Sequence, residues 1–224
     1  MLRFHLITLF PDACEAYLSA SILGRARKNK KIDVKYQSPR DFVDNKWGKV
    51  DERPYGGGPG MVMQALPVVR ATKKALGRKK GKVAIVWFSP SAPPFTNKEA
   101  DKLSKYNDVV LICGRYEGID ERAATMLKTM GTLKRYSVGE ATLTGAEVPA
   151  LAIVDAVTRR LPGVLGKDES VEERRVASPA VYTRPDVIVW GKKTYKVPAI
   201  LKTGHRAKID EWKKGGSHTI PKRP

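Results

Sequence analysis

Short apolar runs alternate with helix-like segments through most of the chain, and this alternation sets the fold class. The runs 4–10, 83–88 and 109–113 have the length of single strands, are rich in β-branched or aromatic residues, and end at turn formers. Helical patterns cover residues 14–29, 66–76, 97–105, 119–130 and 148–161, the last with Pro149 in its first turn. Strands that alternate with helices predict an α/β fold with a mostly parallel sheet.

The length suits one large domain with a small second one, at 224 residues. Pro162-Gly163 ends the last helical pattern, and residues 167–175 are dense in charge without apolar periodicity. We therefore expect a domain over residues 1–162, a linker over 163–181 and a small, very basic C-terminal domain over 182–224. No apolar run reaches the roughly 20 residues that span a bilayer. We expect a cytoplasmic protein without a membrane partner, in which Cys14 and Cys113 are reduced thiols.

Charge is the first indication of function. The formal net charge is +19 and the isoelectric point is about 10.0. Self-repulsion of this size destabilises a compact chain, so a polyanionic partner is favoured over a role of the charge in solubility alone. Residues 192–223 carry most of the basic side chains of the C-terminal segment, opposed only by Asp210 and Glu211. Nucleic acid is the expected partner.

Three loops that follow apolar runs are rich in small residues: 89–92, 114–118 and 138–147. In a parallel sheet such loops gather at the carboxyl ends of the strands, where ligands bind. Small residues leave room for a cofactor, and exposed backbone groups can bond an adenine edge. Glycines that only make turns would explain any one of these loops, but three together favour a cofactor site.

Two further features are ambiguous by themselves. The cluster 53–61, Arg-Pro-Tyr-Gly-Gly-Gly-Pro-Gly-Met, lets a backbone approach a phosphate closely, although a plain surface loop would look the same, and it lacks the P-loop spacing. Arg159, near the end of a predicted helix, is by itself typical of a solvated arginine at a helix C-terminus. The acidic group at 168, 169, 172 and 173 is either a solvated face or the source of a general base.

Taken together, these segments resemble the bacterial tRNA (guanine-N(1))-methyltransferases of the TrmD type, in the SPOUT superfamily. The resemblance covers nearly the whole chain. It is carried, in order, by residues 8–12, 38–42, 51–63, 113–122, 137–150, 155–166, 182–185 and 204–205.

The resemblance implies a parallel sheet flanked by helices, a deep trefoil knot in the C-terminal half of the catalytic domain, and a small, mainly helical C-terminal domain. It implies a homodimer whose active site forms between one subunit's knot and the other's C-terminal domain. The methyl donor would be S-adenosyl-L-methionine (SAM), with Mg²⁺ as a further requirement to be tested and no metal ligands assigned. The substrate would be tRNA, methylated at N1 of the guanine just 3′ of the anticodon (position 37).

The resemblance also implies roles for individual residues. Arg159 occupies the position of the catalytic arginine. The implied RNA contacts are Gly57, Gly58, Pro59, Tyr182, Arg184 and His205. The implied cofactor contacts are Ser89, Pro90, Gly114, Tyr116, Glu117, Val138, Gly139, Glu140, Ala141, Thr142 and Leu143.

The linker departs from the family pattern, in which an Asp acts as general base. The sequence there reads Glu172-Glu173-Arg174-Arg175-Val176, and no Asp aligns. Our hypothesis is that Glu173, with Glu172 as the second choice, removes the N1 proton. Two alternatives remain: a related enzyme that methylates ribose 2′-hydroxyls or rRNA bases, and a catalytically inactive RNA-binding protein.

Overall fold

The computed structural model describes residues 1–78, 81–165 and 180–214. The chain divides into two compact units, Met1–Leu165 and Gly166–Pro224. Within the described residues, no helix is long and apolar enough to cross a membrane. The expected domain boundaries at residues 162 and 181 stay a prediction.

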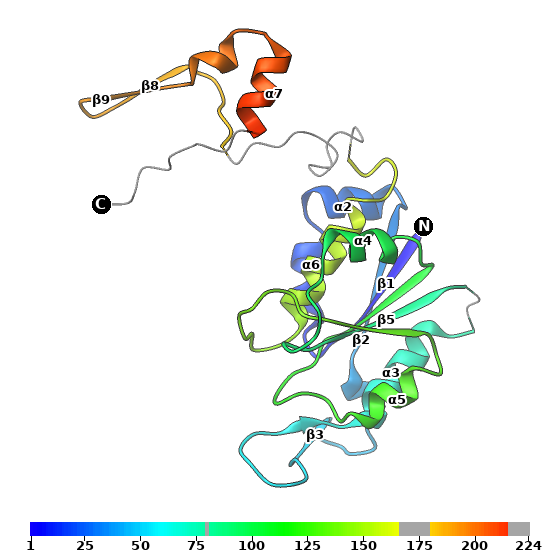
Figure 1. Ribbon diagram of the computed structural model, residues 1–224. Coiled ribbons are helices and arrows are strands. Elements are labelled where there is room, and N and C mark those ends of the chain that lie inside the picture. The colour runs from blue at the N-terminus through cyan, green and yellow to red at the C-terminus, as the bar shows by residue number, and fades with distance from the viewer. Residues whose placement is uncertain (79–80, 166–179, 215–224) are drawn as a thin grey trace. The chain divides into compact units, whose positions relative to one another are not determined.

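A five-stranded parallel sheet forms the centre of the first unit (Figure 1). Its order is β2 (Ile32–Gln37), β1 (Leu2–Ile7), β6 (Asp108–Ile112), β5 (Val83–Phe88) and β7 (Thr132–Tyr136). All five residues of β6, the central strand, are buried. Strands of a parallel sheet that is covered on both faces read as continuous apolar runs, which is why the sequence revealed the central strands. The α/β fold with a parallel sheet flanked by helices is confirmed.

Helices cover both faces of this sheet (Figure 1). On one face lie α1 (Pro11–Leu18), α2 (Ser21–Lys28), α4 (Asn97–Leu103) and α6 (Glu147–Thr158). On the other lie α3 (Ala65–Leu76) and α5 (Arg122–Leu127). Alternate residues of each strand enter opposite cores, so that Val109 and Leu111 pack against the first group of helices and Val110 and Ile112 against the second.

The structure corrects several expected elements. The helix expected over 14–29 is two helices, because Ser21 has a left-handed backbone (φ 47°) and Gly24 passes so close to Ser19 that a Cβ would lie 2.1 Å from its carbonyl oxygen. Strands β2 and β7 were not expected, because both mix polar with apolar residues. A 3₁₀ turn (Pro39–Phe42) and a short hairpin of β3 (Asp51–Glu52) and β4 (Val62–Met63) follow β2, and this hairpin carries the glycine cluster.

The described part of the second unit contains more strand than expected. An antiparallel hairpin of β8 (Val187–Trp190) and β9 (Lys193–Lys196) precedes a 3₁₀ turn (Ala199–Lys202) and helix α7 (Arg206–Lys214). A mainly helical domain is therefore not confirmed. None of residues 180–214 is buried, so these residues form no core of their own.

A buried polar cluster joins β1 to β6 on the side of the sheet that α3 covers. Asp108, which is fully buried, accepts hydrogen bonds from Arg3 (Nε, 2.7 Å) and lies 2.8 Å from His5 Nε2. Burial raises the pKa of Asp108, but its bonds to Arg3 and His5 outweigh burial and hold the pKa below its ordinary value near 3.8. The charged carboxylate is thus stabilised by folding.

We predict that Asp108→Asn lowers the free energy of unfolding at pH 7 by about 3 kcal/mol, because it removes one partner of a buried ion pair. The depressed pKa of Asp108 stabilises the fold above the unfolded pKa near 3.8, and this contribution is lost as pH falls through the folded value. The variant should therefore lose less stability than the unaltered protein on acidification. Urea unfolding at several pH values measures both effects. Asp44→Asn, at a side chain that is 91% exposed, is the matched control and should change little; equal losses in both variants would contradict the prediction.

Candidate active site

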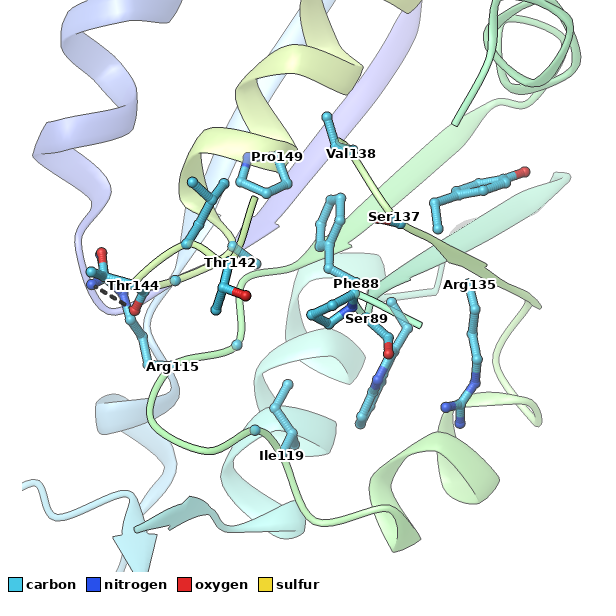
Figure 2. A pocket seen from close by; sticks show the side chains of 18 of the residues that line it. Phe88, Ser89, Arg115, Ile119, Arg135, Ser137, Val138, Thr142, Thr144 and Pro149 are labelled. Carbon is cyan, nitrogen blue, oxygen red and sulfur yellow. Dashed lines mark hydrogen bonds between the residues drawn. The ribbon is translucent and has the colours of Figure 1, made fainter. Parts of the chain in front are cut away.

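The three predicted loops meet in one pocket of about 440 Å³ at the carboxyl ends of β5, β6 and β7. Figure 2 shows Ser89 after β5, Arg115 after β6 and Ser137, Val138 and Thr142 after β7 around it. Every predicted cofactor contact except Glu140 lines this pocket. This size and position are those of a small-molecule site at the edge of a parallel sheet.

Apolar and aromatic side chains make up much of the wall. Trp87, Phe88, Ile119, Val138 and Pro149 all line the pocket, and Figure 2 draws Pro149 at the start of α6. The loops add backbone in unusual conformations, with φ of 59° at Tyr116 and 88° at Gly139. An L-residue in the left-handed region is uncommon and recurs at ligand sites. The wall can therefore hold a flat apolar group while the loops present backbone N–H and C=O groups.

A buried carboxylate ties these loops together. Glu147, at the first turn of α6, accepts a hydrogen bond from Thr8 Oγ1 (2.8 Å) and pairs with Arg115 Nε (2.9 Å). Arg115 also donates to the Thr144 carbonyl (3.4 Å, dashed in Figure 2) and lies over the Phe10 ring at 4.4 Å. One ion pair thus connects the loops that follow β1, β6 and β7.

Glycine is required where the arginine lies. A Cβ at Gly145 would lie 2.4 Å from Arg115 Nε, and the Ala146 amide bonds the Gly114 carbonyl at 3.0 Å. Sequence reasoning included Gly145 in a loop but did not predict that Arg115 and Glu147 would pair, because they are far apart in sequence and neither residue type is unusual.

The opposite wall is fixed by hydroxyl and ionic contacts. Tyr136 donates to Glu99 (2.7 Å) and packs edge to face on Phe95. Burial and this bond raise the pKa of Tyr136, whereas bonds from Lys102 and Tyr136 lower the pKa of Glu99. Arg135 pairs with Glu121 and lies over the Trp87 ring. Arg135 and Glu121 line the pocket, and the sequence had not singled them out.

Among the predicted catalytic and RNA-binding residues that the structure describes in the first unit, Arg159, Gly57, Gly58 and Pro59 do not line this pocket. Arg159 caps the far end of α6, about 15 Å of helix rise beyond Pro149. Glu172 and Glu173 lie outside the described residues. Gly57, Gly58 and Pro59 are exposed in the β3–β4 hairpin, and Tyr182, Arg184 and His205 belong to the second unit. Over the described ranges, no group of three or more His, Cys, Asp or Glu side chains could hold a metal ion.

A parallel α/β domain with a loop-built pocket at the carboxyl ends of its strands places the chain among the α/β proteins with a small-molecule site at this end of the sheet. Comparison with known proteins identifies the family. The family model described as tRNA (Guanine-1)-methyltransferase TrmD matches residues 2–224. The chain belongs to this family.

Individual relatives agree with this assignment. A tRNA (guanine-N(1)-)-methyltransferase of Clostridioides difficile (strain 630) is 37% identical and covers 99% of this chain and 94% of its own length. The protein of the same name from Dictyoglomus turgidum is 38% identical over 100% of this chain and 89% of its own. That of Geobacter sp. (strain M21) is 39% identical over 100% and 88%.

We predict that Glu147→Gln lowers the free energy of unfolding by about 2 kcal/mol, because it leaves the partly buried Arg115 without its counter-charge while preserving side-chain shape. Thermal and urea unfolding measure the loss. Glu140→Gln removes the same charge from an exposed position in the neighbouring loop and should stay within about 0.5 kcal/mol of the unaltered protein. If Glu147→Gln is as stable as Glu140→Gln, the ion pair does not hold the loops.

Proposed function

We propose that this protein transfers the methyl group of SAM to N1 of the guanine immediately 3′ of the anticodon in tRNA, giving 1-methylguanosine. The observation that carries the proposal is the convergence of the three small-residue loops on one pocket, in a chain of the TrmD family. The high positive charge suits an RNA substrate. The proposed location is the cytoplasm.

The pocket fits the methyl donor. Its volume of about 440 Å³ lies within the range of small-molecule sites, and its wall combines apolar side chains with loop backbone. We propose that Ser89, Pro90, Gly114 and Tyr116 hold the donor from one side and the loop 138–143 from the other. The donor, when bound, supplies an electrophilic sulfonium methyl group. Mg²⁺ as an additional requirement stays a prediction.

Deprotonation of guanine N1 is the step for which the protein must supply a group. N1 carries a proton at neutral pH and is a poor nucleophile until this proton leaves. We propose that Glu173, or else Glu172, accepts the proton. Negative charge then develops on O6, which the guanidinium of Arg159 stabilises. Positioning of N1 against the methyl group supplies most of the remaining acceleration.

The position of Arg159 supports a site shared between two subunits. Its Cα lies about 15 Å along α6 from the pocket wall, too far to serve the pocket of its own chain directly. Exposed apolar side chains lie at the other end of this helix, at Phe10, Leu143 and Val148, and along it at Tyr17, whose hydroxyl donates to Asp155. Such side chains, at 44–62% exposure, suit a homodimer interface.

The path of residues 137–146 supports a trefoil knot. Ser137 exchanges backbone hydrogen bonds with the loop after β5, through Pro93 and Phe95, and Ala146 bonds the loop after β6 at Gly114. The segment therefore contacts both of these earlier loops before it enters α6. Passage of a chain between loops already formed is what a knot requires, and it is rare in proteins.

We predict methyl transfer from labelled SAM to a tRNA transcript with guanine just 3′ of the anticodon, and none to the same transcript with adenine there. Nuclease digestion should release labelled 1-methylguanosine. Release of 2′-O-methylguanosine would favour a ribose methyltransferase. RNA binding without transfer to either transcript would favour an inactive RNA-binding protein.

We predict that Glu173→Gln lowers kcat at neutral pH by about 100-fold or more, the usual contribution of a general base, with a smaller effect on KM. Glu172→Gln is the matched control and should keep most of the activity. Full turnover in Glu173→Gln would refute the assignment to Glu173, and loss in Glu172→Gln alone would transfer the role to Glu172.

Glu173→Gln also tests whether the active site is shared between two subunits. Gly114→Val narrows the pocket, because a Cβ there would already lie 3.2 Å from Ile119. Mixed subunits of Gly114→Val and Glu173→Gln should regain about a quarter of the activity if each site takes its pocket and its base from different subunits of a two-fold dimer. No recovery would place both groups in one subunit.

A further inference from the structure

The β8–β9 hairpin displays apolar and aromatic side chains that nothing in the described structure covers. Ile188, Trp190 and Tyr195 are 52%, 78% and 52% exposed. The register pairs Ile188 with Tyr195 and Trp190 with Lys193. Directly opposed residues of an antiparallel pair point to the same face, so these four side chains share one face of the hairpin. Exposed aromatic residues grouped in this way mark a binding surface.

The distance between Trp190 and Tyr195 on this face suits the insertion of one flat ring between their two side chains. Trp190 and Tyr195 are diagonal neighbours, and such positions lie about 7–8 Å apart. Stacked nucleobases repeat at about 3.4 Å, so a base inserted between two rings needs them about 7 Å apart. The two side chains stand roughly perpendicular to the hairpin, as strand side chains do. The indole and the phenol can therefore hold one unpaired base between them.

The charges on the hairpin select an anionic partner. Lys192, Lys193 and Lys196 are exposed, and among the described residues none of them forms an ion pair. No Asp or Glu occurs between Val187 and Lys202, and Asp186 just before the hairpin is paired with Lys202 at 3.0 Å. Exposed lysines without acidic neighbours attract a polyanion. Aromatic rings interleaved with such cations are the pattern of single-stranded nucleic-acid binding.

We propose that the β8–β9 hairpin is an RNA-binding platform on which Trp190 and Tyr195 stack an unpaired base of the tRNA substrate while Lys192, Lys193 and Lys196 contact its phosphates. The proposal rests on the proposed function and specifies which surface of the basic second unit contacts RNA. None of the predicted RNA contacts lies in this hairpin.

The test is tRNA affinity of the full-length protein, measured by fluorescence anisotropy of a labelled transcript. Trp190→Ala should weaken binding about tenfold, within the range for loss of one base–aromatic stack. Trp190→Phe should restore most of the affinity because it keeps a ring. Val189→Ala, at a 67% exposed position on the opposite face of the same strand, is the matched control and should bind tRNA normally.

Salt dependence separates stacking from phosphate contacts. Replacing the three lysines by glutamine should reduce the slope of log Kd against log salt by about 2, whereas Trp190→Ala should leave the slope unchanged. Equal affinities of Trp190→Ala and Val189→Ala would overturn the proposal. So would a change of oligomeric state or of melting temperature in Trp190→Ala, because the ring would then pack against protein.

Failure of the hairpin proposal can be told from failure of the proposed function. Unaltered protein that methylates tRNA, together with a Trp190→Ala variant of normal affinity, would reject only the hairpin. Unaltered protein that binds tRNA but transfers no methyl group would reject the enzyme and leave the affinity test of the hairpin valid.

Discussion

The ion pair between Glu147 and Arg115 is the contact on which the pocket depends. A carboxylate as buried as that of Glu147 is costly unless its charge is compensated, and it accepts a hydrogen bond from Thr8 and forms an ion pair with Arg115 from a second loop. Its position in the first turn of α6 adds the favourable field of the helix N-terminus. The ion pair therefore holds in place the loops that line the pocket, together with the apolar and aromatic side chains of its wall.

The sheet explains why the pocket lies where it does. Helices bury both faces of the sheet. The irregular backbone and polar groups of a ligand site therefore gather in the loops at the ends of the strands. Because β5, β6 and β7 run parallel, the loops that follow them emerge at the same end of the sheet. Helix α6 begins beside the pocket and ends at Arg159. One chain therefore contains both the proposed SAM pocket and the proposed catalytic arginine, but holds them at opposite ends of this helix.

The two units differ in how much apolar surface they bury, and this difference suits them to different roles. The first unit buries two large apolar clusters and can hold a pocket in a defined shape. The described part of the second unit buries no residue and presents lysines and aromatic rings instead. Such a unit contributes affinity through its surface, and the proposed RNA substrate is the kind of partner that its charge and its hairpin suit.

The sequence by itself determined the fold class, the three loops that line the pocket and the family. Strand β5 and the start of α4 appeared as expected, because a strand buried on both faces and an Asn-led helix leave local patterns. Strand β7 did not, since its side chains alternate in polarity and its pairing with β5 lies far away in sequence. Only the tertiary structure decided that Glu147 pairs with Arg115, that Arg159 lies away from the pocket, and that Trp190 and Tyr195 share a face. Each depends on which residues distant in sequence become neighbours, and local propensity does not encode that.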